Sequence, residues 1–226
     1  MDNLVVAAVF LIGTHFGIAS SQIRTALVQR LGERPYLALY SLLALVAIGW
    51  LVSAWRSAPI VPLWMPGPAV AHLPLLIMPF ALLLVVCGVT GPNPTAIGQR
   101  PDPDAREPAT GILRVTRHPF MWGAGLWALV HLIVNGDQAS VIFFGSFALL
   151  ALFGTVLIDM KRTRNPPPGW GVFLQATSSI PLAAILQRRQ RLVPREIGLA
   201  RVAATLALYV LLLWLHPRLF GASPLP

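Results

Sequence analysis

The sequence predicts an all-α membrane protein, a polytopic transmembrane helical bundle of about six spans with additional interfacial helices. Hydrophobic residues make up 56% of the 226 residues and charged residues only 11%, whereas soluble domains carry about 25% charge. The mean hydropathy is +0.70. The apolar residues gather in long runs separated by short basic or proline-rich segments, which is the pattern of membrane-spanning helices.

Six apolar runs are expected to cross the bilayer in succession. They are Asn3–Ser20, Tyr36–Trp55, Leu73–Val89, Pro119–Val134, Ala139–Ile158 and Leu199–Leu215. The first run is preceded by Asp2 and by no Lys or Arg, which is the wrong charge for a cleaved signal peptide. We therefore expect the first run to be retained as a transmembrane helix.

The connecting segments carry their own signals. Ile23, Leu27 and Leu31 are spaced by four residues, which predicts a short helix lying in the membrane interface. Ser57–Pro74 contains five prolines and is expected to fold irregularly over one membrane face. The basic segment Lys161–Glu196 contains an apolar part, GVFLQATSSIPLAAIL, that is expected to dip into the interface.

The net charge of +9 does not indicate a nucleic-acid-binding protein, because the basic residues lie in short loops between apolar runs. All 17 Lys and Arg residues except Arg56 and Arg218 follow the first, third and fifth runs, up to Arg201 at the start of the sixth. Loops rich in Lys and Arg stay in the cytoplasm. Six spans then place both termini on the non-cytoplasmic side.

The histidines are the first candidates for a functional site. Of the five, His15 and His131 lie inside predicted spans, where an ionisable side chain is a functional candidate. His118 precedes a proline, which suits the first turn of a helix. His131 follows His118 by 13 residues, about 20 Å along a helix. His72 and His216 are expected at the ends of spans.

Two interpretations of His15 and His131 are open from the residues alone. Each imidazole can hydrogen-bond to a neighbouring helix, or the two can be axial ligands of one haem, because neutral imidazole binds iron. Any haem would be bound non-covalently, since no CxxCH motif is present. Gly123 would let a helix or a flat ligand approach closely, and Trp127 can line such a pocket. The single cysteine, Cys87, excludes an intrachain disulfide.

Four segments together resemble the NnrU family: GTHFGIASSQIR, GILRVTRHPFMWGAGLWALVHLIVNG, ATSSIPLAAILQRRQRL and HPRLFG. This family groups bacterial NnrU proteins, associated with nitrite and nitric oxide metabolism, with the 15-cis-zeta-carotene isomerases of plants and cyanobacteria. The resemblance covers nearly the whole chain. It implies a single NnrU-like transmembrane domain over residues 1–226 and a bacterial inner-membrane location.

The isomerase branch is similar to a haem b enzyme whose iron is held by histidines. The resemblance implies haem b ligation by His15, in an H-x-G-x-A-S pattern, and by His131, in a W-x-x-x-H pattern after Trp127. The histidine of the family's RHP motif is His118. The resemblance gives Arg117 and His118 a role beside the ligands or at the haem propionates.

The implied function is isomerisation of a cis double bond in a lipid-soluble polyene, with the lipid bilayer and a lipophilic substrate as partners and no nucleic acid. The resembling isomerases have cysteine where this chain has Ala128, which bears on that activity. The alternative is a non-catalytic haem-binding sensor or accessory protein of nitrite and nitric oxide metabolism. RHPFMWG is also similar to the RHPxYxG start of isoprenylcysteine carboxyl methyltransferase-like enzymes. However, Met121 replaces the tyrosine and the basic segment lacks a glutamate before Glu196, so methyl transfer is not expected.

Overall fold

The computed structural model describes residues 1–18 and 22–225, and within them it is helical with no extended sheet strand. The elements, in chain order, are α1 (Asp2–Gly17), α2 (Gln22–Leu31), α3 (Glu33–Arg56), α4 (Pro68–Ala71), α5 (Leu73–Thr90), the 3-10 helix η1 (Gly111–Arg114), α6 (Pro119–Asn135), α7 (Gln138–Arg164), α8 (Trp170–Ala176), α9 (Ala183–Leu186), α10 (Pro194–Ile197) and α11 (Leu199–Phe220).

Every predicted apolar run is helical, which confirms the all-α fold class. Four helical stretches are long and apolar enough to cross a membrane: α3, α4 with α5, α7 and α11; α1 taken together with α2 is a fifth candidate. α1 and α6 alone have 16 and 17 residues, fewer than the ~20 that a bilayer core requires. The structure therefore shows four to five candidate spans, and the sixth stays a prediction. The end of the first predicted run, at Ser20, lies outside the described residues.

The lipid-facing character of the long helices is visible in their exposed side chains. On α3, Leu42 and Leu45 are 59% and 67% exposed, and on α11 Val210 is 63% exposed. An exposed apolar surface of this extent is stable in hydrocarbon but not in water. The protein is accordingly a membrane protein.

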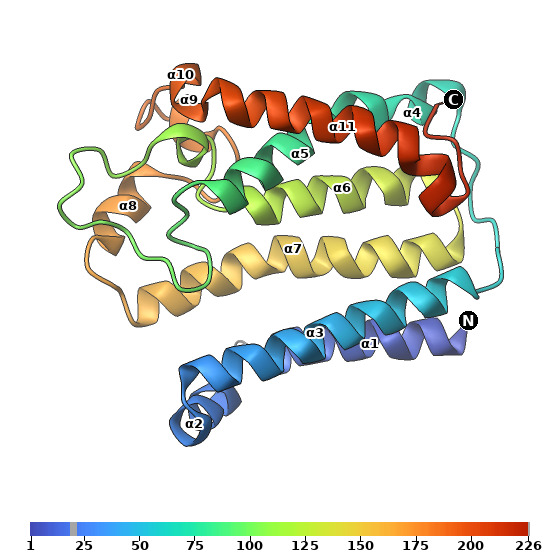
Figure 1. Ribbon diagram of the computed structural model, residues 1–226, viewed down its shortest axis with the longest axis horizontal. Coiled ribbons are helices and arrows are strands. Elements are labelled where there is room, and N and C mark those ends of the chain that lie inside the picture. The colour runs from blue at the N-terminus through green and yellow to red at the C-terminus, as the bar shows by residue number, and fades with distance from the viewer. Residues whose placement is uncertain (19–21, 226) are drawn as a thin grey trace.

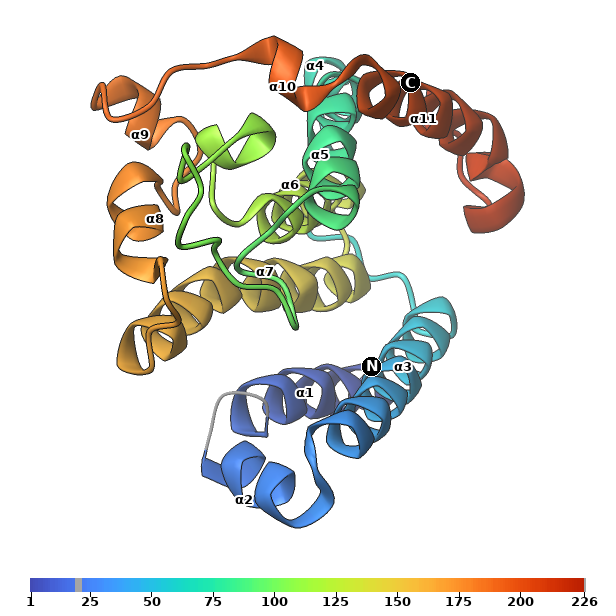
Figure 2. The ribbon, with the colours of Figure 1, turned by 60° about the vertical axis from the view of Figure 1, so that its left-hand side comes forward.

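The long helices run side by side in three groups. α6 packs between α5 and α7, α3 packs on α1, and α11 packs on α5. α1 also packs on α7, so the α1–α3 pair and α11 flank the central α5–α6–α7 group on different sides (Figures 1 and 2). This arrangement fixes which histidines lie near one another.

The bundle has two distinct ends. Both chain termini lie at the end where α6 gives way to α7 (Figure 1), which we call the terminal end. The opposite end carries α2, the start of α6 and the segments 91–118 and 165–198; we call it the basic end because most Lys and Arg residues lie there. Termini at one end agree with the predicted topology, and the side of the membrane stays a prediction.

The proline-rich connection lies against the α6–α7 turn, as expected for a segment covering one membrane face. The backbone N–H groups of Leu63 and Trp64 donate to the carbonyl oxygen of Gly136 at 2.8 and 3.0 Å, and the Trp64 indole donates to Ile133 at 2.9 Å. Gly136 has φ +67°, and a Cβ there would lie 2.2 Å from the Trp64 carbonyl oxygen, so only glycine fits. The expectation of no helix in this segment was wrong for α4, which has a proline in its first turn.

Candidate functional site

Arg117 and His118, at the start of α6, are both bound to Asp159 near the end of α7. The Arg117 guanidinium donates to both carboxylate oxygens, with Nε at 3.0 and 2.9 Å and Nη2 at 2.6 Å. His118 Nε2 lies 2.9 Å from Asp159 Oδ1, and the His118 side chain is completely buried. An ionised carboxylate only accepts, so Nε2 carries the hydrogen. The RHP motif thus fastens α6 to α7.

The backbone of Arg117, in the RHP motif, is also hydrogen-bonded to segments that are distant in sequence. The Arg117 N–H donates to the Ser178 carbonyl at 3.0 Å, and the Arg117 carbonyl accepts from Thr95 Oγ1 at 2.8 Å. The Trp122 indole donates to the Ser179 carbonyl at 2.7 Å. Three segments distant in sequence therefore meet at the start of α6, and Nε, Nη2 and the backbone groups of Arg117 all take part in this cluster.

His118 was a candidate cofactor residue, and its surroundings limit that role. Its Nε2 is occupied by Asp159, and its Nδ1 is buried without a hydrogen-bond partner among the described residues. A neutral ring with the hydrogen on Nε2 leaves a bare lone pair on Nδ1. The completely enclosed side chain gives that lone pair no access to a ligand in this arrangement.

His131 lies in an aromatic cluster between α6 and α7 at the terminal end. Its ring stacks on Phe144 with centroids 5.2 Å apart and contacts Trp127 at 5.6 Å. Trp127 also contacts Phe147 edge-on at 5.4 Å. His131 Nδ1 donates to the carbonyl oxygen of Trp127 at 2.8 Å. A carbonyl cannot donate, so Nε2 carries the lone pair, which is the tautomer that binds metal through Nε2.

His15 shows the same local chemistry at a different place. Its Nδ1 donates to the Leu11 carbonyl, one turn earlier in α1, at 2.8 Å, and its ring contacts Tyr40 of α3 edge-on at 5.7 Å. Nε2 again retains its lone pair. Each imidazole taken singly is therefore a chemically competent iron ligand.

The structure does not bring His15 and His131 together. His131 stacks on Phe144 of α7, whereas Phe16, next to His15, contacts Phe153 of the same helix at 6.4 Å. Phe144 and Phe153 are nine residues apart, which is about 13 Å along a helix. Two imidazoles on one metal ion lie about 2 Å from it on each side. Among the described residues no ring contact joins the two imidazoles, and their joint ligation of one iron stays a prediction.

His131 has a different histidine in its vicinity. His216, in the last turns of α11, lies close enough to interact with it electrostatically. Its own Nδ1 donates to the carbonyl oxygen of Ala222 at 2.8 Å. From the sequence, His131 was expected inside a span and His216 at the end of one, so their proximity was not predicted.

Gly123 does admit a close approach, but from a helix. A Cβ on Gly123 would lie 2.6 Å from the carbonyl oxygen of Ala81 and 2.7 Å from Val85 Cγ2, both on α5. The space at Gly123 is thus filled by α5, and a cofactor contact at Gly123 stays a prediction. Ala128, three residues before His131, is fully buried.

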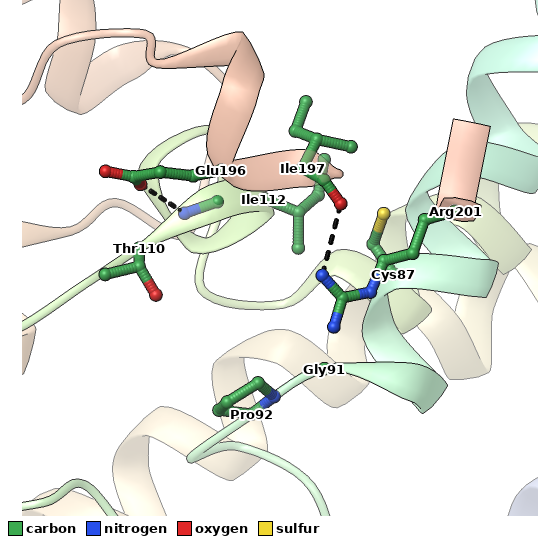
Figure 3. A pocket seen from close by; sticks show the side chains of 9 residues that line it. Cys87, Gly91, Pro92, Thr110, Ile112, Glu196, Ile197 and Arg201 are labelled. Atoms are coloured by element: carbon green, nitrogen blue, oxygen red, sulfur yellow. Dashed lines mark hydrogen bonds between the residues drawn. The ribbon is translucent and has the colours of Figure 1, made fainter. Parts of the chain in front are cut away.

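Sequence reasoning missed Asp159 and the carboxylate partner of Arg114. Asp159 carries a signal in hindsight, since it is the one acidic residue in the run LFGTVLIDMKR. Glu196 accepts from the Gly111 N–H at 2.7 Å (Figure 3) and from Arg114 Nε and Nη2 at 2.8 and 2.9 Å. These contacts join η1 to α10, which are more than 80 residues apart. No local sequence pattern predicts a contact over that separation.

Two curated proteins are similar to this chain in sequence. The chain is 35% identical over 83 residues to a chloroplastic 15-cis-zeta-carotene isomerase of Zea mays. The aligned region covers 37% of this chain and 23% of that protein. It is 36% identical over 121 residues to the Arabidopsis thaliana protein of the same name, covering 50% of this chain and 32% of that one. These matches cover a third or less of each relative's length. No solved structure matches.

The family comparison covers far more of the chain than either relative does. The family model described as NnrU protein matches residues 3–224, so it includes the RHP motif, the aromatic cluster around His131 and the helices that flank them. With a match over almost its entire length, the chain belongs to the NnrU family.

Proposed function

We propose that this protein isomerises a cis double bond in a polyene dissolved in the membrane. The observation that carries this proposal is the similarity, over half of the chain, to proteins named for zeta-carotene isomerisation. The exposed apolar helices support it, because a carotenoid-like substrate resides in hydrocarbon and can reach such a protein laterally. The Ala128 position supplies no thiol, so the proposed chemistry does not use a sulfur there.

The proposed site is the aromatic cluster of Trp127, His131, Phe144 and Phe147. Its rings present π-faces to a conjugated chain, and aromatic contacts of this kind are favourable in offset or edge-on geometry. The cluster lies on helices α6 and α7, whose packing holds the rings in place. These residues would bind and orient the polyene within the bilayer.

Haem b is the proposed cofactor, and His131 is its proposed ligand. The hydrogen bond from Nδ1 to the Trp127 carbonyl fixes the tautomer and orients Nε2, as is usual for metal-binding histidines. When bound, haem iron supplies electron density that lowers the barrier to rotation about a double bond. The proposal rests on His131, and His15 as a second ligand stays a prediction.

The experiment is co-expression of the full chain with enzymes that produce tri-cis-zeta-carotene, followed by chromatographic identification of the carotene isomers. We expect the wild-type protein to convert the 15-cis bond and His131→Ala to lose at least ~100-fold of this conversion, as when an essential group is removed from a site. Purified wild-type protein should show a Soret band that shifts on reduction, and His131→Ala should have lost most of it.

His72→Ala is the matched control. His72 is at the N-terminus of α5, is exposed, and also donates from Nδ1 to a carbonyl one turn earlier, at 2.7 Å. It should keep both the conversion and the absorbance. Unchanged carotene stereochemistry with wild-type protein would contradict the isomerase proposal and favour the accessory role. A colourless protein from haem-sufficient cells would contradict the haem proposal separately.

A further inference from the structure

The basic end contains an open cavity with a surplus of positive charge. Its volume is about 480 Å³, within the range of small-molecule sites. Arg114 of η1 lies on one side, and Arg188, Arg189 and Arg191 line it from the segment after α9. Glu107 is the one carboxylate among its lining residues, and its side chain is 57% exposed.

The charge of Arg114 is neutralised by carboxylates, whereas the charges of the other three arginines are not. Arg114 is paired with Glu196 at 2.8 Å and with Glu107 at 3.3 Å. Arg189 donates only to neutral acceptors, the carbonyl oxygens of Gln175 and Thr177 and the Gln187 side chain. Within the part of the chain that the structure describes, the side chains of Arg188 and Arg191 have no hydrogen bond or ion pair. Three guanidinium charges therefore remain available to an anion.

The arginines are presented by an ordered turn. Arg188 has φ +59°, a conformation that L-residues rarely adopt, and its N–H donates to the Ile185 carbonyl at 2.9 Å. The next two N–H groups, of Arg189 and Gln190, both donate to the Ala184 carbonyl at 2.9 and 3.1 Å. The buried Gln190 side chain accepts from Arg114 Nη1 at 2.7 Å. This network fixes the turn against η1 and leaves the arginine side chains at the cavity.

Exposed apolar residues lie near the arginine turn in the sequence and indicate the source of the anion. Leu186 is 81% exposed and Leu192 is 51% exposed, on either side of the arginine turn, and Ile180 is 64% exposed. Basic residues beside exposed leucines are typical of a segment at the membrane interface. Phosphate oxygens match guanidinium groups in geometry and charge. We propose that this cavity binds the phosphate-bearing headgroup of an anionic membrane lipid. The proposal does not depend on isomerase activity.

A smaller neighbouring cavity does not fit this role. It is lined by Cys87, Ile112 and Arg201, among others (Figure 3), and has a volume of about 30 Å³, room for a water molecule or two. The headgroup proposal therefore concerns the larger cavity alone.

The test is thermal unfolding of the full chain in a neutral detergent, with added short-chain phosphatidylglycerol. We expect Tm to rise with the lipid concentration, because a ligand that binds the folded state stabilises it. Arg188→Gln with Arg191→Gln should raise the apparent Kd about tenfold or more, since each guanidinium makes charge-assisted hydrogen bonds to phosphate. A circular dichroism spectrum of the double variant verifies its fold, and Arg191→Gln alone should give a smaller change in the same direction.

Matched controls separate the lipid from other sources of the effect. Arg30→Gln with Arg34→Gln removes the same charge from two exposed arginines at the same end, one in α2 and one in the first turn of α3, and should leave the apparent Kd unchanged. Phosphatidylcholine of the same chain length and inorganic phosphate should each give little shift. An equal shift with either of these, or an equal loss in the Arg30 and Arg34 control, would overturn the proposal.

Discussion

At the scale of single residues, the strongest local constraint is the carboxylate of Asp159. It accepts from Arg117 and from His118, whose side chains are 12% and 0% exposed, and is itself 19% exposed. Charged and polar groups that are enclosed in this way are stable only when they are paired. Asp159 therefore determines whether the RHP motif can begin α6 where it does.

Replacement of Asp159 tests this role directly. Asp159→Ala should lower the free energy of unfolding by about 3–5 kcal/mol, because it leaves the Arg117 guanidinium and the His118 ring enclosed without their acceptor. Asp159→Asn keeps one acceptor oxygen and should cost less. Thermal melts by circular dichroism in detergent measure both. Asp104→Ala, in an exposed loop, is the control, and a melt of Asp159→Ala equal to that of Asp104→Ala would contradict this role.

At the scale of elements, α5 and α6 interlock through two glycines. Gly123 of α6 lies against the backbone of α5 at Ala81, and Gly88 of α5 lies against the backbone N of Phe120 on α6, where a Cβ would be 2.7 Å away. Small residues let helix backbones approach closely, and in lipid this packing is a main source of helix association. The α5–α6 contact positions both the RHP motif and His131.

A methyl group at Gly123 should push the two helices apart. Gly123→Ala is expected to destabilise the fold by about 1–3 kcal/mol, because the added Cβ would overlap backbone atoms that cannot move independently. Gly49→Ala on α3 is the matched control: it has open space around it, so it should be neutral or stabilising by up to ~1 kcal/mol. Thermal melts of the two variants measure these changes in stability. An unchanged melting temperature for Gly123→Ala would mean that α5 and α6 repack at no cost in stability.

At the scale of the whole molecule, the ion pair between Arg114 and Glu196 joins the middle of the chain to its C-terminal third. Arg114 and Glu196 are 82 residues apart, and their bidentate contact holds η1, α10 and the turn before α10 together. The hydrogen bonds from Arg114, and next the one from the Gly111 N–H, lower the pKa of Glu196 below its ordinary value of about 4.5. Hydrogen bonding to Glu196 in turn raises the pKa of Arg114, which stays charged.

The sign of the pH dependence follows from this lowered pKa. Because the folded-state pKa of Glu196 lies below the unfolded one, its stabilisation is fully present above pH 4.5 or so and is lost as the pH falls through the folded-state pKa. Wild type should melt at a higher temperature than Glu196→Gln at pH 6, and the difference should shrink toward pH 3. Glu33→Gln, at an exposed pair with Arg24, should show no such convergence. A constant difference across this range would contradict the assignment.

The helical fold and the site residues differ in how far they could be predicted. The apolar runs predicted where every long helix begins to within about three residues, because a backbone in hydrocarbon must satisfy its hydrogen bonds within a helix. Two predicted ends were too early: α7 continues past Ile158 to Arg164, and α11 continues past Leu215 to Phe220. His131 and Trp127 were also identified together, because both match the W-x-x-x-H pattern of the family resemblance. Asp159 was not identified, because it reaches His118 from another helix 41 residues away.

The sequence by itself determined that this chain is a helical membrane protein, that His15 and His131 lie within helices and where the positive charge lies, since each of these follows from local composition. Only the tertiary structure decided that His131 meets Phe144 while His15 meets Tyr40, that α5 fills the space at Gly123, and that Asp159 holds both Arg117 and His118. The physical reason is that the axial position of one packed helix relative to another depends on how their side chains interlock. No periodicity within either helix specifies that relative position.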